Sequence, residues 1–504
     1  MRATMHHIPT TRDVLSQMKQ PLAVFVQPMA ATEEGEMPVP MVDLTEGQGG
    51  GPVRCTRCKG YVNPFVKWLN NGQQWLCNLC HMTNTTPSFY RCPLDGAGLR
   101  VDANSRPELS CGSVDFVATK DYCVRPVQEP MYIFVVDTSP PAISSGFTAL
   151  VLAAAVNAVE QTLAQCQANP DEGLQRSGYG ATPIFAGGKR AKVGLVSFDN
   201  VVTFYRSSGG EFGNVVMSDI EDPFAALPPS EWLVALDDAP RAVVGKVGTL
   251  ADHILKHAAA GASTGATGNG STMPASCGCA AIQSVASALH DTGGRMLYFS
   301  HSTPLLGKGR LRPRSSANDY GTDREVDMYR PLTPKETSKA EREVGELYRN
   351  LATVCSRRQV CLHLFLTDGG GICDVATLGQ LARATGGQTH FLRTSPGSVP
   401  SNSDKEGKRP LAIGELTAES MRAELAIVLA ATSANESVLK VRCSPGLRCT
   451  EYRGSGVQHN SMDEFDMAAC DRWTCCLCTI KHDGGAALST NEKVHGRSPF
   501  ILAW

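Results

Sequence analysis

Two Cys-x2-Cys pairs, Cys55/Cys58 and Cys77/Cys80, lie near the N-terminus of the chain with 18 residues between them. A pair on a tight turn presents two thiolates from one side, and a second such turn completes a tetrahedron around zinc. Four thiolates leave no coordination position for water, so the pattern predicts one structural, non-catalytic Zn²⁺. Residues 53–90 are therefore expected to fold as a zinc ribbon whose folding is coupled to metal binding.

The remaining cysteines are interpreted as reduced thiols, because the count is odd (19) and the chain begins without an apolar signal sequence. A second cluster lacks metal-ligand spacing and is interpreted as small buried side chains; it comprises Cys470, Cys475, Cys476 and Cys478. Cys475 and Cys476 are adjacent and would point to opposite faces of a strand. Cys277 and Cys279 are interpreted in the same way as the second cluster.

Composition excludes several protein classes. Hydrophobic residues make up 42% of the 504 residues and charged residues 19%, which excludes wholesale disorder. Lys plus Arg (47) nearly balances Asp plus Glu (49), so bulk attraction to nucleic acid is not expected. No run of about 18 apolar residues is apparent, so no membrane span is expected and the predicted location is cytoplasmic.

Apolar runs alternate with helical patterns between residues 131 and 431. Strands are predicted at 131–136, 192–198, 295–299, 361–366 and 388–392, and helices at 148–166, 278–290, 341–355, 374–384 and 418–431. This alternation predicts an α/β domain with a mostly parallel, doubly wound sheet. Asp199-Asn200 is expected to form a two-residue hairpin turn at one edge of that sheet.

Four stretches of small and polar residues interrupt the pattern and are predicted to be mobile surface insertions: 167–190, 258–276, 308–336 and 394–411. Short strands and turns follow Ser437 and predict an all-β unit. The sequence ends at Phe500–Trp504 within an apolar strand, which favours a C-terminal truncation.

Several segments resemble the cargo-adaptor subunit of the inner COPII vesicle coat. The zinc segment VRCTRCKGYVNPFVKWLNNGQQWLCNLCHMTNTTP (53–87) is similar to that family's zinc finger, and its Tyr61–Val66 stretch is the most specific part. Residues 106–139 resemble the lead into the family's trunk domain, and 216–224 and 290–309 resemble the trunk interior. Residues 439–455 resemble the start of the return to its β-sandwich.

The resemblance implies a multidomain α/β plus β architecture. After an N-terminal segment (1–20), residues 21–50 would give the first strands of a β-sandwich, with the zinc finger (53–90) inserted. A von Willebrand A-like trunk with insertions would span 125–433, and a truncated β-sandwich would span 437–504. The family's helical and gelsolin-like domains and its long Pro-rich N-terminal arm are not expected in this chain, because no segment of the sequence resembles them.

The resemblance also implies a non-enzymatic function in transport from the endoplasmic reticulum to the Golgi. The family's subunit pairs with a paralogous inner-coat subunit and is recruited by a small GTPase. It works beneath an outer coat cage and binds sorting signals in the cytosolic tails of membrane cargo. The expected location is peripheral, at endoplasmic reticulum exit sites and on COPII vesicles.

One family site captures acidic signals with cations beside the finger and on a sandwich strand. The positions that match are Arg54, Lys59, Lys440 and Arg442. Lys440 and Arg442 are two residues apart and would share one face of a strand. Lys59 and Lys440 replace arginines that relatives carry, and lysine lacks the bidentate fork of arginine, so a different signal preference is expected.

Three alternatives remain at this stage. A von Willebrand A-type metal site would use Asp137, Ser139 and Asp368, although Pro140-Pro141 removes the second serine of the usual Asp-x-Ser-x-Ser. The paralogous GTPase-stimulating subunit shares the architecture, but the distal domain that supplies its arginine is missing. A nucleic-acid-binding ribbon is disfavoured because aromatic residues total 6% and no basic stripe exists. No nucleophile elbow, phosphate loop or His-Glu-x-x-His motif supports an enzyme.

Overall fold

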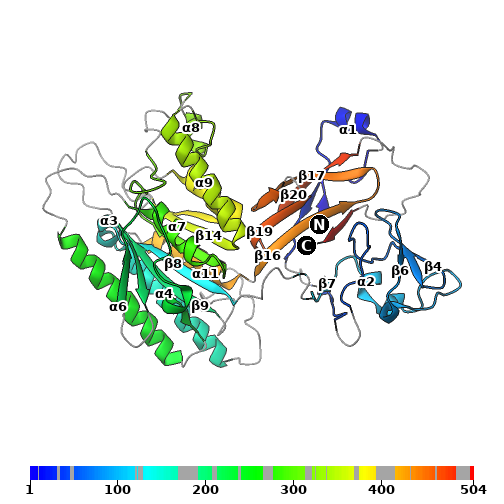
Figure 1. Cartoon of the computed structure of the whole chain (residues 1–504), viewed down its shortest axis with the longest axis horizontal. Helices are drawn as coiled ribbons and strands as arrows, with labels where there is room; N and C mark the ends of the chain where they lie inside the picture. The colour runs from blue at the N-terminus through cyan, green and yellow to red at the C-terminus, as the bar shows by residue number, and fades with distance from the viewer. Residues whose placement is uncertain are drawn as a thin grey trace.

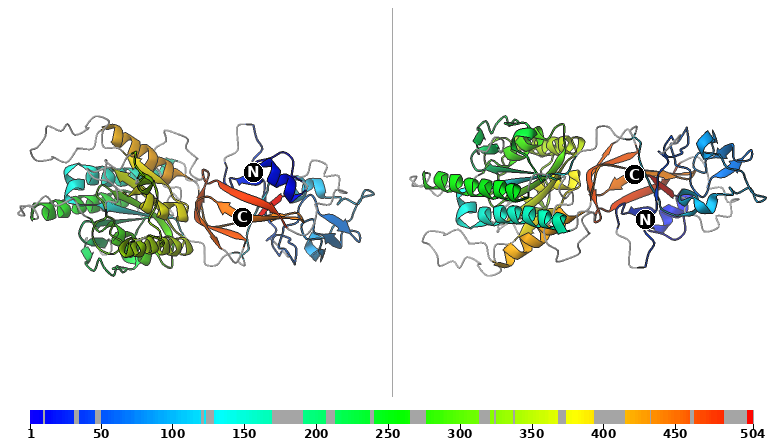
Figure 2. Two further views of the ribbon diagram at one scale, coloured as in Figure 1. Left: turned by 90° about the horizontal axis from the view of Figure 1, so that it is seen from above. Right: turned by 90° about the horizontal axis from the view of Figure 1, so that it is seen from below.

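The structure is a computed structural model. It describes all residues except 10, 31–34, 46–49, 120–121, 123–128, 169–190, 207–212, 237–239, 265–275, 313–320, 324, 337, 368–373, 393–414, 432, 460–462, 484–499 and 504. The molecule is elongated, with an α/β trunk, a β-sandwich and the cysteine-rich region in a row (Figures 1 and 2).

The trunk is built on a central sheet in the order β11-β10-β9-β8-β13-β14-β15. Its parallel strands are β8 (Met131–Asp137), β9 (Lys192–Phe198), β13 (Gly294–Ser300), β14 (Val360–Thr367) and β15 (Thr389–Leu392). The strands β10 (Val202–Arg206), β11 (Gly213–Met217) and β12 (Val234–Ala235) are antiparallel to their neighbours. Every residue of β8 and β14 is buried, because helices cover both faces of the sheet.

Two helix layers cover the sheet, which confirms the doubly wound prediction. One face carries α4 (Phe147–Ala168), α6 (Pro240–Thr264) and α11 (Glu415–Ala430). The other carries α7 (Gly278–Ala288), α9 (Lys339–Arg357) and α10 (Val375–Thr385). Shorter helices are α3 (Pro140–Ser144), α5 (Pro229–Trp232) and α8 (Glu325–Tyr329).

One described helix, α4, passes a length and composition test for a membrane span over Phe147–Ala164. Its side chains Val151, Ala155 and Val159 are fully buried in the trunk core, as expected of a core helix in a globular domain. An Ala-rich helix packed between a sheet and a second helix has the same composition as a lipid-facing one.

The structure corrects three sequence predictions in the trunk. Residues 258–264, expected in a mobile insertion, form the last turns of α6, since alanine favours helix. Leu311 and Leu332, also expected in an insertion, are buried in the core. The connection after β9 has three residues, because Phe198 pairs with Val202, and β11 rather than β10 forms the edge. The insertion 394–411, and most of 167–190, lie outside the described residues.

The region after residue 433 is an all-β unit, as predicted. Its strands are β16 (Ser433–Cys443), β17 (Leu447–Arg453), β18 (Val457–His459), β19 (Glu464–Asp471), β20 (Cys476–His482) and β21 (Phe500–Ala503). They form two sheets, β18-β19-β16-β21 and β1-β2-β20-β17, which include β1 (Arg2–Ala3) and β2 (Ala23–Val26) from the N-terminus. Helix α1 (Arg12–Met18) packs Leu15 against this sandwich.

Five of the six cysteines outside the zinc pattern that the sequence singled out are buried. Cys470, Cys476 and Cys478 are buried in the sandwich core and Cys277 and Cys279 in the trunk core, as predicted. Cys475 is exposed, so its interpretation as a buried side chain was wrong. Cys475 immediately precedes β20, so it does not share the buried face of that strand.

Candidate zinc centre and adjoining cationic surface

Two knuckles bring the four cysteines of the zinc pattern together. The Lys59 N–H donates to the Cys55 carbonyl (3.0 Å), and the His81 N–H donates to the Cys77 carbonyl (3.0 Å). Lys59 and His81 both adopt positive φ (59° and 56°), so the two turns have matching geometry. Backbone N–H groups of each turn donate to the sulfur of its first cysteine, and such bonds stabilise a thiolate.

The thiols form a compact group. Cys55 Sγ lies 3.6 Å from Cys80 Sγ, and Cys58 Sγ lies 3.6 Å from Cys77 Sγ. All four sulfurs lie within 4.8 Å of one another. Zn–S bonds of about 2.3 Å in a tetrahedron give sulfur separations of about 3.8 Å, so the site fits one zinc ion. This is the one group of three or more potential metal ligands among the described residues.

The electrostatics of the site favour a bound cation. Burial raises the pKa of the Cys58 and Cys77 thiols. Burial also acts to raise the pKa of Cys55, but N–H groups of Cys58, Arg57 and Asn84 that donate to its sulfur outweigh it and lower that pKa. Deprotonation of the Cys58 and Cys77 thiols therefore needs a compensating positive charge, which a bound metal ion would supply.

A three-stranded sheet supports the knuckles, formed by β4 (Lys67–Leu69), β5 (Gln74–Leu76) and β6 (Thr83–Thr85). Trp75 of β5 is 1% exposed and centres a small core with Val62, Cys77 and Tyr90. Residues 88–110 continue through η1 (Ser88–Tyr90), η2 (Ala103–Ser105) and α2 (Pro107–Ser110). The strands β3 (Met41–Val42) and β7 (Asp115–Phe116) pair separately from the sandwich.

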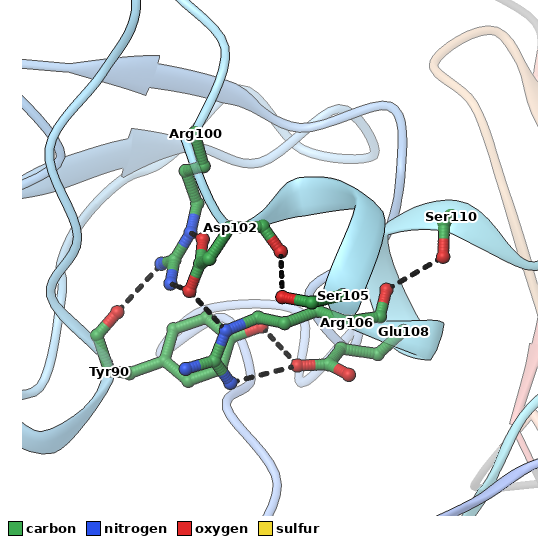
Figure 3. Close-up of polar contacts among 7 residues, drawn as sticks. All are labelled: Tyr90, Arg100, Asp102, Ser105, Arg106, Glu108 and Ser110. Atoms are coloured by element: carbon green, nitrogen blue, oxygen red, sulfur yellow. Dashed lines mark hydrogen bonds and ion pairs between the residues drawn. The ribbon is translucent and has the colours of Figure 1, made fainter.

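A buried ion network fastens residues 100–110 to this core (Figure 3). Arg100, which is 3% exposed, donates from Nε and Nη2 to the carboxylate of Asp102 (2.8 and 2.7 Å) and from Nη1 to the Tyr90 carbonyl (2.6 Å). Arg106 bonds the same Asp102, and the Tyr90 hydroxyl donates to Glu108 (2.6 Å). The Arg100 and Arg106 guanidinium groups hold the pKa of Asp102 well below its usual range.

The structure places the four predicted cations in different environments. Arg54 is exposed, with its guanidinium 4.5 Å from the ring centroid of Tyr122, and Lys59 is exposed at the first knuckle. Arg442 is half-buried and donates from Nε to the Cys58 carbonyl (2.9 Å). Lys440 forms an ion pair with Glu464 (2.9 Å).

Arg442 links the sandwich to the finger. It alternates along β16 with the buried Leu439 and Val441, so Lys440 and Arg442 share the outer face of the strand. Gly60 lies beside this contact, and a Cβ there would overlap Leu79 at 2.7 Å but only touch the Arg442 side chain at 3.8 Å, so the glycine is required by packing within the finger.

Tyr61 is a common neighbour of Arg54 and Arg442. Its backbone pairs with Arg54, and its ring stacks on Phe116 at 5.4 Å. Burial raises the pKa of the Tyr61 phenol, and the charges of Arg54 and Arg442 act in the opposite direction. Sequence reasoning did not assign a role to Phe116, Tyr122 or Glu464; their spacing carries no signal, because they reach the site through long-range packing.

The trunk site proposed for a metal is arranged differently. Asp137 is fully buried and accepts four hydrogen bonds: from the Ser139 and His301 N–H groups, and from the N–H and hydroxyl of Ser302 (2.6–2.9 Å). The carboxylate oxygens are thus occupied by hydrogen bonds to two loops of the same chain, those that follow β8 and β13. Ser139 Oγ is buried without a hydrogen-bond partner in the described part of the chain, and Asp368 lies outside it.

The comparisons with known proteins agree with this architecture. The Sec23/Sec24 trunk domain profile matches residues 127–395, and the Sec23/Sec24 zinc finger profile matches residues 52–90. The finger match and the four-cysteine cluster show that the chain carries one structural zinc site. The relatives described next are protein transport and coat proteins by name, not enzymes.

Relatives match almost the whole chain. Protein transport protein SEC24 B of Arabidopsis thaliana is 31% identical over 485 residues, covering 96% of this chain and 38% of the relative. Protein transport protein sec24 of Neurospora crassa is 28% identical over 467 residues, covering 92% and 42%. The crystal structure of the human COPII-coat protein Sec24c superposes with a TM-score of 0.74 at 27% identity, covering 96% of this chain and 56% of that one.

The chain thus spans roughly two fifths of the length of these curated relatives, between 38% and 42%. The trunk match alone covers more than half of its residues, and the zinc finger match precedes the trunk match in the chain. Taken with the relatives, which are SEC24 proteins, these matches show that the chain belongs to the Sec24 family.

Proposed function

We propose that this chain is a COPII coat subunit that binds acidic sorting signals in cargo tails for transport from the endoplasmic reticulum to the Golgi. The observation that carries the proposal is the convergence of Arg54 and Arg442 on Tyr61 beside the zinc knuckle. Cations that lie beside aromatic rings suit the binding of an extended peptide with carboxylate side chains.

The zinc site holds part of this surface in place. Arg442 bonds the carbonyl of a zinc ligand, Cys58, so the finger and the sandwich strand are held in one register. Lys59, which follows that ligand, projects from the same knuckle. Metal binding would therefore position the cations rather than act on the peptide.

The proposed domain division follows the family. Residues 53–90 would be the finger, 125–433 the trunk, and 437–504 with strands from 21–50 the sandwich. Strand β2 supports this division because it lies in the sheet of β20.

The proposed partners are the paralogous inner-coat subunit, the small coat GTPase and the outer cage. Association with exit-site and vesicle membranes would be peripheral. SEC24 relatives favour this adaptor role over the GTPase-stimulating one.

Peptide binding by the full chain tests the cargo surface. A fluorescein-labelled peptide of alternating Glu and Leu is titrated with wild type and with Arg54→Glu and Arg442→Glu, and anisotropy is measured at low and high salt. Each reversal should weaken binding at least about tenfold, because it replaces attraction by repulsion, and salt should weaken wild-type binding.

Two controls separate charge from damage to the fold. Arg448→Glu changes an exposed arginine on β17 of the same sandwich and should leave affinity unchanged. Zinc content of each variant reports on the Arg442–Cys58 contact. Unchanged affinity of both reversed variants at full zinc content would rule out the cargo surface.

Co-elution tests the coat assignment independently. The full chain is mixed with a Sec23-type subunit and passed over a size-exclusion column. A stable one-to-one complex supports the coat role, whereas separate elution of two folded proteins contradicts it.

A further inference from the structure

Asn84 contacts the zinc site without being a ligand. It lies on β6 opposite Trp75 and is 4% exposed. Its Nδ2 donates to Cys55 Sγ at 3.4 Å and to the Met82 carbonyl at 2.9 Å. Its Oδ1 accepts from the N–H and the hydroxyl of Thr56 at 2.9 and 3.0 Å.

These contacts fix the orientation of the amide. The Thr56 N–H is a donor and the Met82 carbonyl is an acceptor, so only one of the two amide orientations satisfies both. In that orientation the NH₂ group must face Cys55. A buried amide with all of its partners in place is held rigidly, and its dipole is aimed at the sulfur.

Asn84 also joins the two halves of the site. Thr56 lies between the first two ligands, whereas Met82 follows the second knuckle and its carbonyl accepts from the N–H of Cys77 (2.9 Å). One side chain therefore spans both knuckles and touches a sulfur. Among the described residues, the other hydrogen bonds found for the Cys55, Cys58 and Cys77 sulfurs come from backbone N–H groups and from neighbouring thiols.

We propose that Asn84 is the positioning residue that controls zinc retention in this chain. A hydrogen bond donated to a metal-bound thiolate stabilises its negative charge, and a clamp between the knuckles preserves the spacing of the sulfurs. Outer contacts of this kind typically change metal affinity by about 10- to 100-fold. Asn84 thus acts through Cys55 and the knuckle geometry rather than by ligation.

The finger contains a matched control. Asn63 is 9% exposed and makes three polar contacts, against four for Asn84: its Nδ2 donates to the Tyr61 carbonyl and to Asn78 Oδ1, and its Oδ1 accepts from the Phe65 N–H. None of these partners is a sulfur. Asn63→Ala therefore removes a comparable buried amide network from the same domain without touching a ligand.

Zinc transfer from the intact, zinc-loaded chain to a chelating dye tests the proposal. Asn84→Ala should release zinc about 10- to 100-fold faster than wild type, and Asn63→Ala should differ from wild type by less than about threefold. Asn84→Asp retains the acceptor for Thr56 but replaces the donor to sulfur by a negative charge, so it should release zinc at least as fast as Asn84→Ala.

Cobalt substitution provides a readout that a purely structural role would not move. The thiolate-to-Co²⁺ charge-transfer band should shift in Asn84→Asp and stay at the wild-type energy in Asn63→Ala. Wild-type zinc release and an unshifted band in Asn84→Asp would overturn the proposal, as would equal release rates for the two alanine variants. Thermal unfolding at saturating zinc verifies that each variant is folded.

Discussion

Lys440 and Glu464 form an ion pair between neighbouring strands of the proposed cargo surface, with Nζ 2.9 Å from Oε1. The register places Leu439 opposite Phe465, so the two charged residues are cross-strand neighbours. Their side chains are 31% and 30% exposed. An acidic peptide must therefore compete with Glu464 for the Lys440 ammonium group.

Glu464→Gln should strengthen binding of the acidic peptide. Removing the carboxylate frees Lys440 and removes a like charge from the surface; partly exposed pairs contribute at most about 1 kcal/mol, so the gain should be up to about fivefold. Anisotropy titration measures it. Glu451→Gln, which breaks the Glu451–Arg453 pair on β17, is the matched control. Equal effects of the two variants would show that Glu464 has no specific influence on the site.

Asp137 should stabilise the trunk without a metal ion. Asp137→Asn keeps the shape but turns an NH₂ group toward at least one N–H donor, so the free energy of unfolding should fall by about 2 kcal/mol. Millimolar Mg²⁺ should leave the melting temperature of the wild-type chain unchanged, since the carboxylate oxygens already accept four hydrogen bonds. Calorimetry with and without Mg²⁺ checks both expectations, and a rise in melting temperature with Mg²⁺ would contradict the second.

Local patterns were predictable from the sequence. The zinc ligands follow from spacing alone, because each knuckle closes within a few residues. The buried strands β8 and β14 follow from continuous apolar runs, which only a sheet covered on both faces accommodates. Helix α6 was not predicted: no element was assigned to residues 240–257, and 258–264 were placed in an insertion because this Ala-rich end lacks the large apolar side chains that reveal helical periodicity.

Contacts between distant segments were not predictable in this way. Arg442 and Cys58 are 384 residues apart, and their contact depends on how the finger docks onto the sandwich. The resemblance to the family gave the positions of the cations but not their partners. The Glu464 ion pair and the stacking of Arg54 on Tyr122 come from packing that no local pattern encodes.

His363 should make the trunk less stable in mild acid. Burial lowers its pKa well below the usual value, aided by the charges of Arg295 and His390. The unfolded chain takes up a proton near pH 6.5 whereas the folded chain does not, so stability should fall by about 1.4 kcal/mol per pH unit below that point. His363→Gln should reduce this slope by up to the contribution of one proton, about 1.4 kcal/mol per pH unit. Urea unfolding between pH 8 and pH 5 measures it, and parallel curves for the two proteins would contradict the assignment.

Gly386 should be essential for the junction between trunk and sandwich. It ends α10 with a φ of 79°, and a Cβ there would overlap the carbonyl oxygen of Ala469 on β19. Gly386→Ala therefore combines left-handed backbone strain, about 1–2 kcal/mol, with a backbone clash between domains, and should cost about 3 kcal/mol in all.

Gly245→Ala is the matched control for this substitution. Gly245 lies within α6 with open space around its Cα, so alanine should stabilise the chain by about 0.5–1 kcal/mol. Denaturant unfolding of both variants measures the two signs, and hydrogen exchange locates the effect. Gly386→Ala should increase exchange in β19 and at the end of α10, because the clash pushes those two elements apart. Unchanged exchange at β19 would show that the domains tolerate a wider separation there than the packing of Gly386 against Ala469 implies.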